Sequence, residues 1–117
     1  MTPRELIDYC LTFPAAYEDY PFDTTSAVMR HSANRKMFAL ISERLGRVYI
    51  NLKCEPQQAD FFRTIYKDVT PGWHMNKTHW NTVYMDGDVP IHELHQMISH
   101  SYELIKPKIS KKLKRVE

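Results

Sequence analysis

Apolar and polar positions along the chain follow first a helical period and then a strand period. In the first segment the apolar residues recur at helical spacing: Leu6, Ile7, Cys10 and Leu11. The preceding Thr2-Pro3-Arg4-Glu5 has the form of a capping box with proline at the first helical position, and Phe13-Pro14 ends the pattern. The pattern predicts a helix over residues 3–12, followed by the acidic, aromatic loop AAYEDYPFD.

Three short segments then show the alternation and the β-branched or aromatic content of strands. They are residues 26–31, 36–42 and 47–53, separated by turn-like SANR and ERLG sequences of hairpin length. In the third segment Val48, Ile50 and Leu52 point to one side, and Arg47, Tyr49, Asn51 and Lys53 point to the other. We expect an antiparallel meander with one sheet face that is either wet or covered by something polar.

The second half of the chain again begins with a helical pattern, continues with strand patterns, and ends with a third helical pattern. A helix is predicted from Glu55-Pro56 to about residue 66, and a strand over residues 80–85, with a weaker partner strand near 68–75 because Pro71 cannot donate to a ladder. The last helix should run from near Pro90 to a stop at Pro107. The expected buried face of the second helix is Ala59, Phe62, Ile65 and Tyr66, and that of the last is Ile91, Leu94, Ile98, Ser101 or Tyr102, and Ile105.

The predicted element order is α-β-β-β-α-β-β-α, which is typical of an α+β fold with an antiparallel sheet and helices packed on one face. At 117 residues the chain suits one domain, which we place at residues 1–105, followed by a basic tail at 106–117. No apolar run approaches the roughly 20 residues of a membrane span, and no export signal is visible. The two cysteines, Cys10 and Cys54, show no C-x-x-C spacing, so we expect free buried thiols and a cytoplasmic location. We also expect the protein to be a monomer.

The net charge of +2 hides an asymmetry. The segment KPKISKKLKR, residues 106–115, holds six of the sixteen basic residues and no acid. Residues 1–105 therefore carry ten basic and thirteen acidic residues, a net charge of −3. Because attraction to the phosphate backbone supplies most non-specific affinity for nucleic acid, this distribution weakens the case for a body that clamps a duplex.

Residues 71–87, PGWHMNKTHWNTVYMDG, crowd two His, two Trp, a Tyr, a Lys and two Asn into one stretch. Such a cluster fits a binding surface, a metal site or an aromatic sheet packed on a core. Together with the first helix, the YEDYPF loop and the VPIHELHQMISHSYELI helix, the stretch resembles the MmcQ/YjbR family of small bacterial proteins over essentially the whole chain. The most specific part is H-x-N-K-x-H-W-N-T-V, present here as residues 74–83.

The resemblance implies a frataxin-like (CyaY-like) fold whose hairpins project as a "double wing", a shape that has suggested DNA binding. It implies no established enzymatic activity and no cofactor, and fold alone does not define function. The partner we expect on this basis is DNA or single-stranded nucleic acid, bound by the hairpins and the open sheet face. The tentative binding residues are Arg47, Tyr49, Asn51, Lys53, His74, Asn76, Lys77, His79 and Trp80.

Stacking on aromatic rings contributes roughly 1 to 3 kcal/mol per base and tolerates any sequence, which suits Tyr49 and Trp80 as platforms. The competing interpretation is that a strand Tyr or Trp packs against its cross-strand neighbours, and that Lys and Arg form a solvated face. A module that binds a protein or a small ligand is the alternative function, with the loop aromatics Tyr17, Tyr20 and Phe22 as anchors, unless Tyr20 to Phe22 fold back onto the first helix and the sheet.

Metal binding and catalysis have weaker signals. His92 and His95 stand at i, i+3 spacing with Glu93 between them, but zinc hydrolases carry H-E-x-x-H, whereas this sequence reads H-E-L-H. No G-x-S-x-G, glycine-rich phosphate loop or reactive-cysteine pattern is present. We therefore assign no catalytic residue, no metal and no cofactor.

Overall fold

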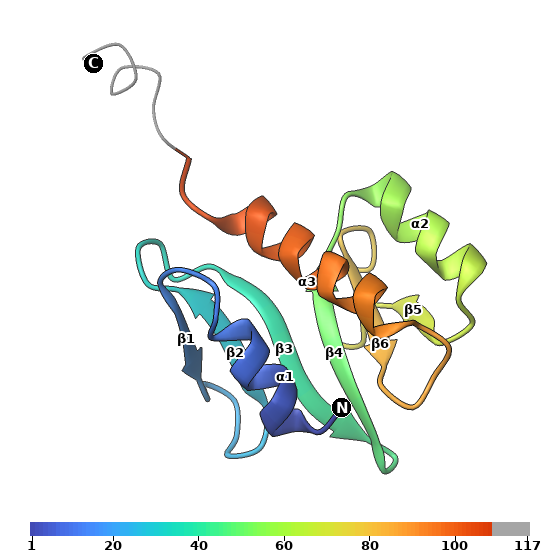
Figure 1. Ribbon diagram of the computed structural model, residues 1–117, viewed down its shortest axis with the longest axis horizontal. Coiled ribbons are helices and arrows are strands. Elements are labelled where there is room, and N and C mark those ends of the chain that lie inside the picture. The colour runs from blue at the N-terminus through green and yellow to red at the C-terminus, as the bar shows by residue number, and fades with distance from the viewer. Residues whose placement is uncertain (109–117) are drawn as a thin grey trace.

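Six antiparallel strands form one sheet in the computed structural model, which describes residues 1–108. The strands, in the spatial order β1-β2-β3-β4-β6-β5, are β1 (Ala16–Asp19), β2 (Ala27–His31), β3 (Met37–Arg44), β4 (Arg47–Lys53), β5 (Val69–Pro71) and β6 (Trp80–Tyr84). The helices are α1 (Pro3–Cys10), α2 (Pro56–Ile65) and α3 (Ile91–Ile105), and Figure 1 shows their arrangement. Most of the predicted basic tail, residues 109–117, lies outside the described residues.

The α+β class and the antiparallel sheet are confirmed, but the expected order lacked one strand. Residues 16–19, predicted as loop, form the edge strand β1, which pairs with β2 from Ala16↔His31 to Asp19↔Val28. The sequence AYED has no apolar alternation, so the local pattern carries no strand signal. Pairing with β2 creates the strand, and its polar side chains suit an exposed edge.

The helix starts agree with the capping signals, and the expected buried faces agree in part. Thr2 Oγ1 accepts from Glu5 N at 3.1 Å while Glu5 Oε1 accepts from Thr2 N at 2.8 Å, so the capping box is complete. These hydrogen bonds lower the pKa of Glu5. Ile65 and Ile91 were expected to be buried, and this is wrong: they are 45% and 50% exposed because each is the terminal residue of its helix.

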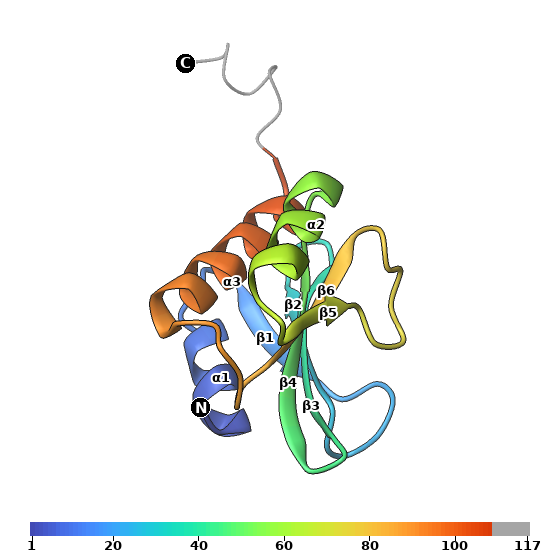
Figure 2. The ribbon, with the colours of Figure 1, turned by 90° about the vertical axis from the view of Figure 1, so that its right-hand side faces the viewer.

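The three helices cover one face of the sheet, as expected. Figure 2 shows α1 and α3 on one side of the strands, with α2 above the β5–β6 end. The core between helices and sheet includes Leu6, Met29, Phe38, Ile50, Val83 and Ile98, all at most 1% exposed. No helix within residues 1–108 is both long and apolar enough to cross a membrane.

One buried hydroxyl, that of Ser101, fixes α3 on the sheet. The β2–β3 register shifts between Met29 and Arg30, which leaves Phe38 as the extra residue of a β-bulge. Ser101 Oγ donates to Phe38 O at 2.6 Å and accepts from Lys53 N at 2.9 Å. The serine thus links a β3 carbonyl to a β4 amide, and satisfies two buried backbone groups that would otherwise lack a partner.

We expect Ser101→Ala to lower the free energy of unfolding by about 2 to 3 kcal/mol, because it leaves one buried carbonyl and one buried amide without a hydrogen-bond partner. Urea denaturation followed by circular dichroism measures the change. The matched control is Ser99→Ala, on the same helix and only half-buried, which should change stability by less than about 0.5 kcal/mol. Equal effects of the two substitutions would contradict a bridging role.

Candidate functional site

The sheet face opposite the helices, which we call the far face, is covered by two loops. The 20–26 loop joins β1 to β2, and the 72–79 loop joins β5 to β6; Figure 2 shows both on the side away from α1 and α3. Tyr49 is 6% exposed and Asn51 1% exposed. The expectation that these two residues present an open face is therefore wrong, because loop residues pack on them.

A chain of hydrogen bonds holds the 72–79 loop against the sheet. Asn51 of β4 and Thr82 of β6 are cross-strand neighbours, and the Thr82 hydroxyl donates to Asn51 Oδ1. Asn51 Nδ2 donates to Trp73 O at 3.1 Å, and Trp73 N donates to Thr82 Oγ1 at 2.7 Å. The backbone amide and carbonyl of Trp73 thus provide hydrogen-bond partners for the buried side chains of Thr82 and Asn51. These bonds fix the position of Trp73.

The Trp73 ring lies between a cation and a second ring. Arg44 Cζ stands 3.7 Å from the centroid of the Trp73 ring, a cation–π geometry, and Arg44 Nη1 also donates to the Tyr84 hydroxyl at 3.0 Å. The His74 ring approaches the Trp73 ring edge-on at 4.4 Å between centroids. Trp73 is therefore held as a wall above the sheet.

The backbone of the 72–79 loop needs glycine at one position and a left-handed residue at another. A Cβ on Gly72 would lie 2.8 Å from Trp80 Cβ and 2.9 Å from Met75 Cβ, closer than real Cβ contacts allow. Gly72 N donates to Trp80 O at 2.9 Å, which closes the loop. His74 has φ +58°, a conformation uncommon outside glycine and one often associated with functional sites.

Asn76 and Lys77 use their polar groups inside the same loop. Asn76 Oδ1 accepts from Thr78 N at 2.9 Å and from His79 N at 3.2 Å, an Asx turn. Lys77 Nζ donates to Gly72 O at 2.9 Å. These two candidates for nucleic-acid contact shape the loop, and His79 lies exposed at its end.

Arg63 of α2 joins the loop to the helical side of the protein. Its Nε donates to Asn81 Oδ1 at 2.6 Å, and its Nη2 donates to Trp80 O at 3.2 Å and to Lys77 O. Asn81 Nδ2 in turn donates to Ala59 O of α2 at 3.2 Å. One guanidinium group thus anchors the end of the 72–79 loop, and sequence analysis did not single it out.

Between the two loops lies a pocket of about 320 Å³, which we call the far-face pocket. Its walls are loop residues and its floor is the sheet. The lining residues are Phe22, Asp23, Ser26, Met37, Leu40, Tyr49, Asn51, Trp73, His74 and Met75. Phe22 is 68% exposed at the rim, so the expectation that it folds back onto the first helix is wrong.

One carboxylate, that of Asp23, faces this largely apolar pocket. Asp23 Oδ1 accepts from Thr25 N at 2.9 Å and from Ser26 N at 2.6 Å, and these hydrogen bonds lower the pKa of Asp23. Burial raises the pKa of the Tyr49 phenol. At neutral pH the pocket therefore combines a negative charge from Asp23 with an uncharged phenol.

The structure brings together some of the predicted site residues and separates others. Tyr49, Asn51 and His74 line the far-face pocket, while Asn76 and Lys77 support its wall. Lys53 and Trp80 face each other across β4 and β6 but do not line this pocket. Phe22, an anchor residue in the alternative ligand-binding hypothesis, also lines this pocket. Asp23 and Trp73 line it too, and the sequence assigned neither to a binding site; the available signal for Trp73 was its place in the aromatic 71–87 stretch.

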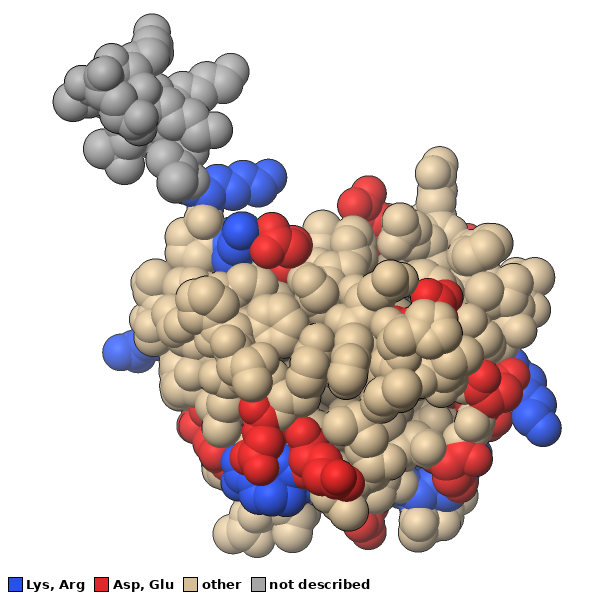
Figure 3. Space-filling model, viewed as in Figure 1, with Lys and Arg blue, Asp and Glu red and all other residues tan. Residues whose placement is uncertain are grey.

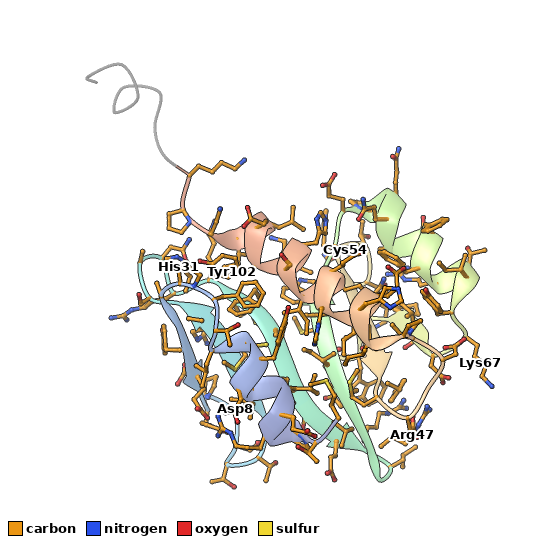
Figure 4. All side chains as sticks on the ribbon, viewed as in Figure 1. Asp8, His31, Arg47, Cys54, Lys67 and Tyr102 are labelled. Carbon is orange, nitrogen blue, oxygen red and sulfur yellow. The ribbon has the colours of Figure 1, made fainter. Side chains whose placement is uncertain are left out.

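Arg47, predicted to meet phosphate, is engaged in ion pairs. It approaches Asp86 at 2.6 Å and Asp68 at 3.0 Å, and these hydrogen bonds raise its pKa. Its Cζ also lies 4.1 Å from the centroid of the Tyr84 ring. Figure 4 labels Arg47 near the end of the β3–β4 hairpin, away from α2 and α3.

The two thiols are buried, and one of the imidazoles packs on a tyrosine ring. Burial raises the pKa of Cys10 to about 12 and that of Cys54 to about 11, so both stay protonated at neutral pH. His95 stacks on Tyr9 with 4.0 Å between ring centroids. Within residues 1–108 no three His, Cys, Asp or Glu side chains gather as a metal site.

Comparisons with known proteins place these features in a class of small α+β proteins. The family model described as YjbR matches residues 11–104. The uncharacterized protein YjbR of Escherichia coli K12 is 33% identical over 103 residues, covering 88% of this chain and 86% of the relative. The uncharacterized protein YyaQ of Bacillus subtilis is 33% identical over 100 residues, covering 75% and 84%.

Two solved structures have the same fold. A crystal structure of a Pseudomonas syringae protein has a TM-score of 0.80 at 31% identity and covers 91% of this chain and 100% of that one. The structure of Deinococcus radiodurans protein DR2400, of family-model domain DUF419, has a TM-score of 0.82 at 29% identity, covering 98% and 89%.

The chain belongs to the YjbR family. This confirms the family resemblance, and the relatives carry names that assign no function. The frataxin-like architecture, the double wing, the monomeric state and the cytoplasmic location stay predictions.

We expect Arg63→Met to lower the free energy of unfolding by about 2 to 3 kcal/mol. The substitution removes the charged donor that bonds to Asn81 Oδ1 and to the carbonyl oxygens of Lys77 and Trp80. Urea denaturation measures the loss. The control is Lys67→Met just beyond α2, whose exposed side chain points outward in Figure 4 and which should be near neutral. Equal stability of the Arg63 variant and wild type would show that the guanidinium does not anchor the loop.

The Arg47–Asp86 pair gives a pH-dependent prediction. Hydrogen bonds from Arg47 lower the pKa of Asp86 below its usual 3.8. The stabilisation is therefore present above pH 3.8 and lost as pH falls through the lowered value. Asp86→Asn should be less stable than wild type at pH 7, and the difference should shrink as the pH falls below 3.8. Thermal unfolding across the acid range checks the sign, and a stability difference that grows as the pH falls would contradict it.

Proposed function

We propose that this protein is a small-ligand-binding protein and not an enzyme. Its site is the far-face pocket, and its ligand is a planar aromatic molecule that carries an amino group. The observation that carries the proposal is the pocket itself. Its volume of about 320 Å³, its aromatic walls and its few polar groups match the usual character of ligand sites.

The aromatic walls favour a flat ligand. Trp73 and Tyr49 offer ring faces or edges inside the pocket, and Phe22 at the rim is exposed enough to close over a ligand. Aromatic pairs contribute about 0.5 to 1.5 kcal/mol beyond area burial. Hydrogen bonds already fix the backbone of Trp73, so binding requires little ordering of this wall.

Asp23 favours a ligand that donates a hydrogen bond. Its carboxylate is ionised at neutral pH, and the amides of Thr25 and Ser26 hold it in place. The same charge repels a phosphate or carboxylate that enters the pocket. An amino group on an aromatic ring satisfies both the apolar walls and this acceptor.

Nucleic-acid binding, which the family resemblance suggests, is the competing function and has less geometric support. Tyr49 is too deeply buried to serve as an open stacking platform, and Arg47 and Lys77 are engaged within the protein. On the helical face, which Figure 3 shows, most of the surface is uncharged, and several basic groups lie beside acidic ones. On the far face, the Asp23 carboxylate in the pocket repels phosphate.

The non-enzymatic part of the proposal is supported by the buried thiols and by the hydrogen bonds that already occupy the serine hydroxyl in the far-face pocket. Tyr49 and Ser26 line that pocket beside Asp23, but Ser26 Oγ is bonded to Asp23 Oδ2 at 3.1 Å and shares a hydrogen bond with Ser42 Oγ at 2.8 Å. The hydroxyl of Ser26 therefore stabilises the 20–26 loop, and the pocket is suited to binding a ligand.

A matched pair of nucleosides tests the ligand class. Adenosine carries an amino group where purine riboside carries only a hydrogen atom, so Asp23 can accept a hydrogen bond from the first and not from the second. At about −0.3 kcal/mol per heavy atom, adenosine should bind with a Kd on the order of 0.1 mM, and purine riboside at least about tenfold more weakly. Isothermal titration calorimetry at pH 7 measures both.

Variants locate the binding. His74→Asn keeps a residue that tolerates the left-handed backbone and removes the ring, so it should weaken adenosine binding about tenfold. His79→Asn, on the exposed end of the same loop, should leave it unchanged. Equal binding of the two nucleosides, or no binding of either at millimolar concentration, sinks the proposal. Tight binding of a single-stranded oligonucleotide in the absence of nucleoside binding would favour the competing function.

A further inference from the structure

A second cavity, of about 300 Å³, lies between α2 and α3 above the ends of β4 and β6. It is separate from the far-face pocket, because it is on the helical side of the sheet. The residues that line it are Leu52, Lys53, Cys54, Gln58, Phe61, Phe62, Asn81, Val83, Glu93, Gln96, Met97 and His100. Figure 4 shows Cys54 between the two helices.

The cavity exists because the two helices rest on different strands. α2 packs on β5 and β6, whereas α3 packs on β3 and β4. Two polar contacts join the helices, one near each end: the Tyr66 hydroxyl donates to Glu93 Oε1 at 3.2 Å, and His100 Nε2 lies 3.8 Å from Glu55 Oε1. Between these two contacts the side chains of α2 and α3 do not fill the space between the helices, and the cavity remains.

The inner surface of the cavity is apolar. Leu52, Val83 and Met97 are at most 8% exposed and form its floor with the half-buried Phe62, while Phe61 is 57% exposed at its mouth. Most of the surface over α2 and α3 is uncharged in Figure 3. An exposed Phe beside a buried apolar floor is the arrangement of a ligand site that closes over an apolar body.

One polar atom in the cavity wall lacks a partner. Among the residues that the structure describes, His100 Nε2 is the buried side-chain nitrogen or oxygen without a hydrogen bond. Its distance of 3.8 Å to Glu55 exceeds hydrogen-bond range. Because an unpartnered buried polar group is costly, a ligand atom that pairs with this nitrogen gains affinity that the rest of the wall cannot supply.

The charges around the cavity decide the ligand class. Glu55 and Glu93 flank it at its two ends and disfavour an anion, although Lys53 lines one edge. Burial holds the Cys54 thiol protonated at neutral pH, so the site is suited to reversible binding. We infer that this cavity binds an uncharged, mainly apolar molecule with one hydroxyl or amide group, which pairs with His100 Nε2.

Two probes that share a naphthalene ring and differ in charge test the inference. 2-Naphthol is uncharged at pH 7, and 2-naphthoate is an anion. Nuclear magnetic resonance titration should show naphthol shifting the Met97 and Cys54 signals, with naphthoate binding at least about tenfold more weakly. Absence of naphthol binding at millimolar concentration, or equal binding of the two probes, overturns the inference.

Variants with matched controls assign the contact. His100→Phe keeps a ring of similar size but removes the nitrogen, and should weaken naphthol binding about tenfold. His92→Phe, exposed on the same helix outside the cavity, should have no effect. Met97→Trp should fill the cavity and abolish binding, whereas His74→Asn in the other pocket should not change it. Unaltered binding to the Met97 variant, with the fold confirmed by circular dichroism, would contradict the assignment.

Cys54 supplies an independent readout. Its thiol lines the cavity, while Cys10, the last residue of α1, is fully buried. Naphthol should slow the alkylation of Cys54 by iodoacetamide and leave that of Cys10 unchanged, as followed by peptide mass mapping. Alkylation of Cys54 at the same rate with and without saturating naphthol would place the ligand elsewhere.

Discussion

Two buried polar side chains on the far face of the sheet, Asn51 and Thr82, impose the constraint on which the site depends. Both are at most 1% exposed, so each needs a hydrogen-bond partner within the protein. They bond to each other, and the remaining donor and acceptor are met by the backbone of Trp73. A loop that satisfies these groups must lie on the sheet, and the pocket beside it follows from that position.

The two faces of the sheet are covered by different means. On the helical face, apolar side chains of α1 and α3 pack against strand residues, and Ser101 supplies a polar bridge from α3 to β3 and β4. On the far face, short loops supply few apolar groups, so hydrogen bonds and the Arg44–Trp73 contact hold the cover in place. Loops that are held at a few points leave space between them, and this space is the far-face pocket.

The sequence indicated the fold well where the periodicity was strong. The capping box at Thr2, the alternation of β4 and the apolar stripe of α3 each depend on residues close in the chain, so local rules predict them. The edge strand β1 was missed because its residues gain strand structure only by pairing with β2. The sequence left open whether this sheet face is covered, but it did not indicate that Trp73 covers Tyr49, because the two residues are 24 positions apart in the chain.

The candidate site was predicted in composition but not in role. Within the 74–83 stretch, which the sequence singled out, Asn76 and Lys77 turn their polar groups into the loop, while the ring of Trp73 forms the wall. Sequence spacing gives no direction for side chains in a loop with a left-handed residue such as His74. The residue of α2 that anchors the end of the 72–79 loop, Arg63, reaches it only through tertiary packing, which local sequence patterns do not predict.

The central claim is that the 72–79 loop is a fixed part of the fold, so that the far-face pocket exists before any ligand arrives. Amide hydrogen exchange at Trp73, followed by nuclear magnetic resonance on the free protein, tests it most directly. The account predicts that this amide, bonded to Thr82 Oγ1 at 2.7 Å, exchanges nearly as slowly as the central amides of β4. Exchange at the rate of an unstructured peptide would contradict it.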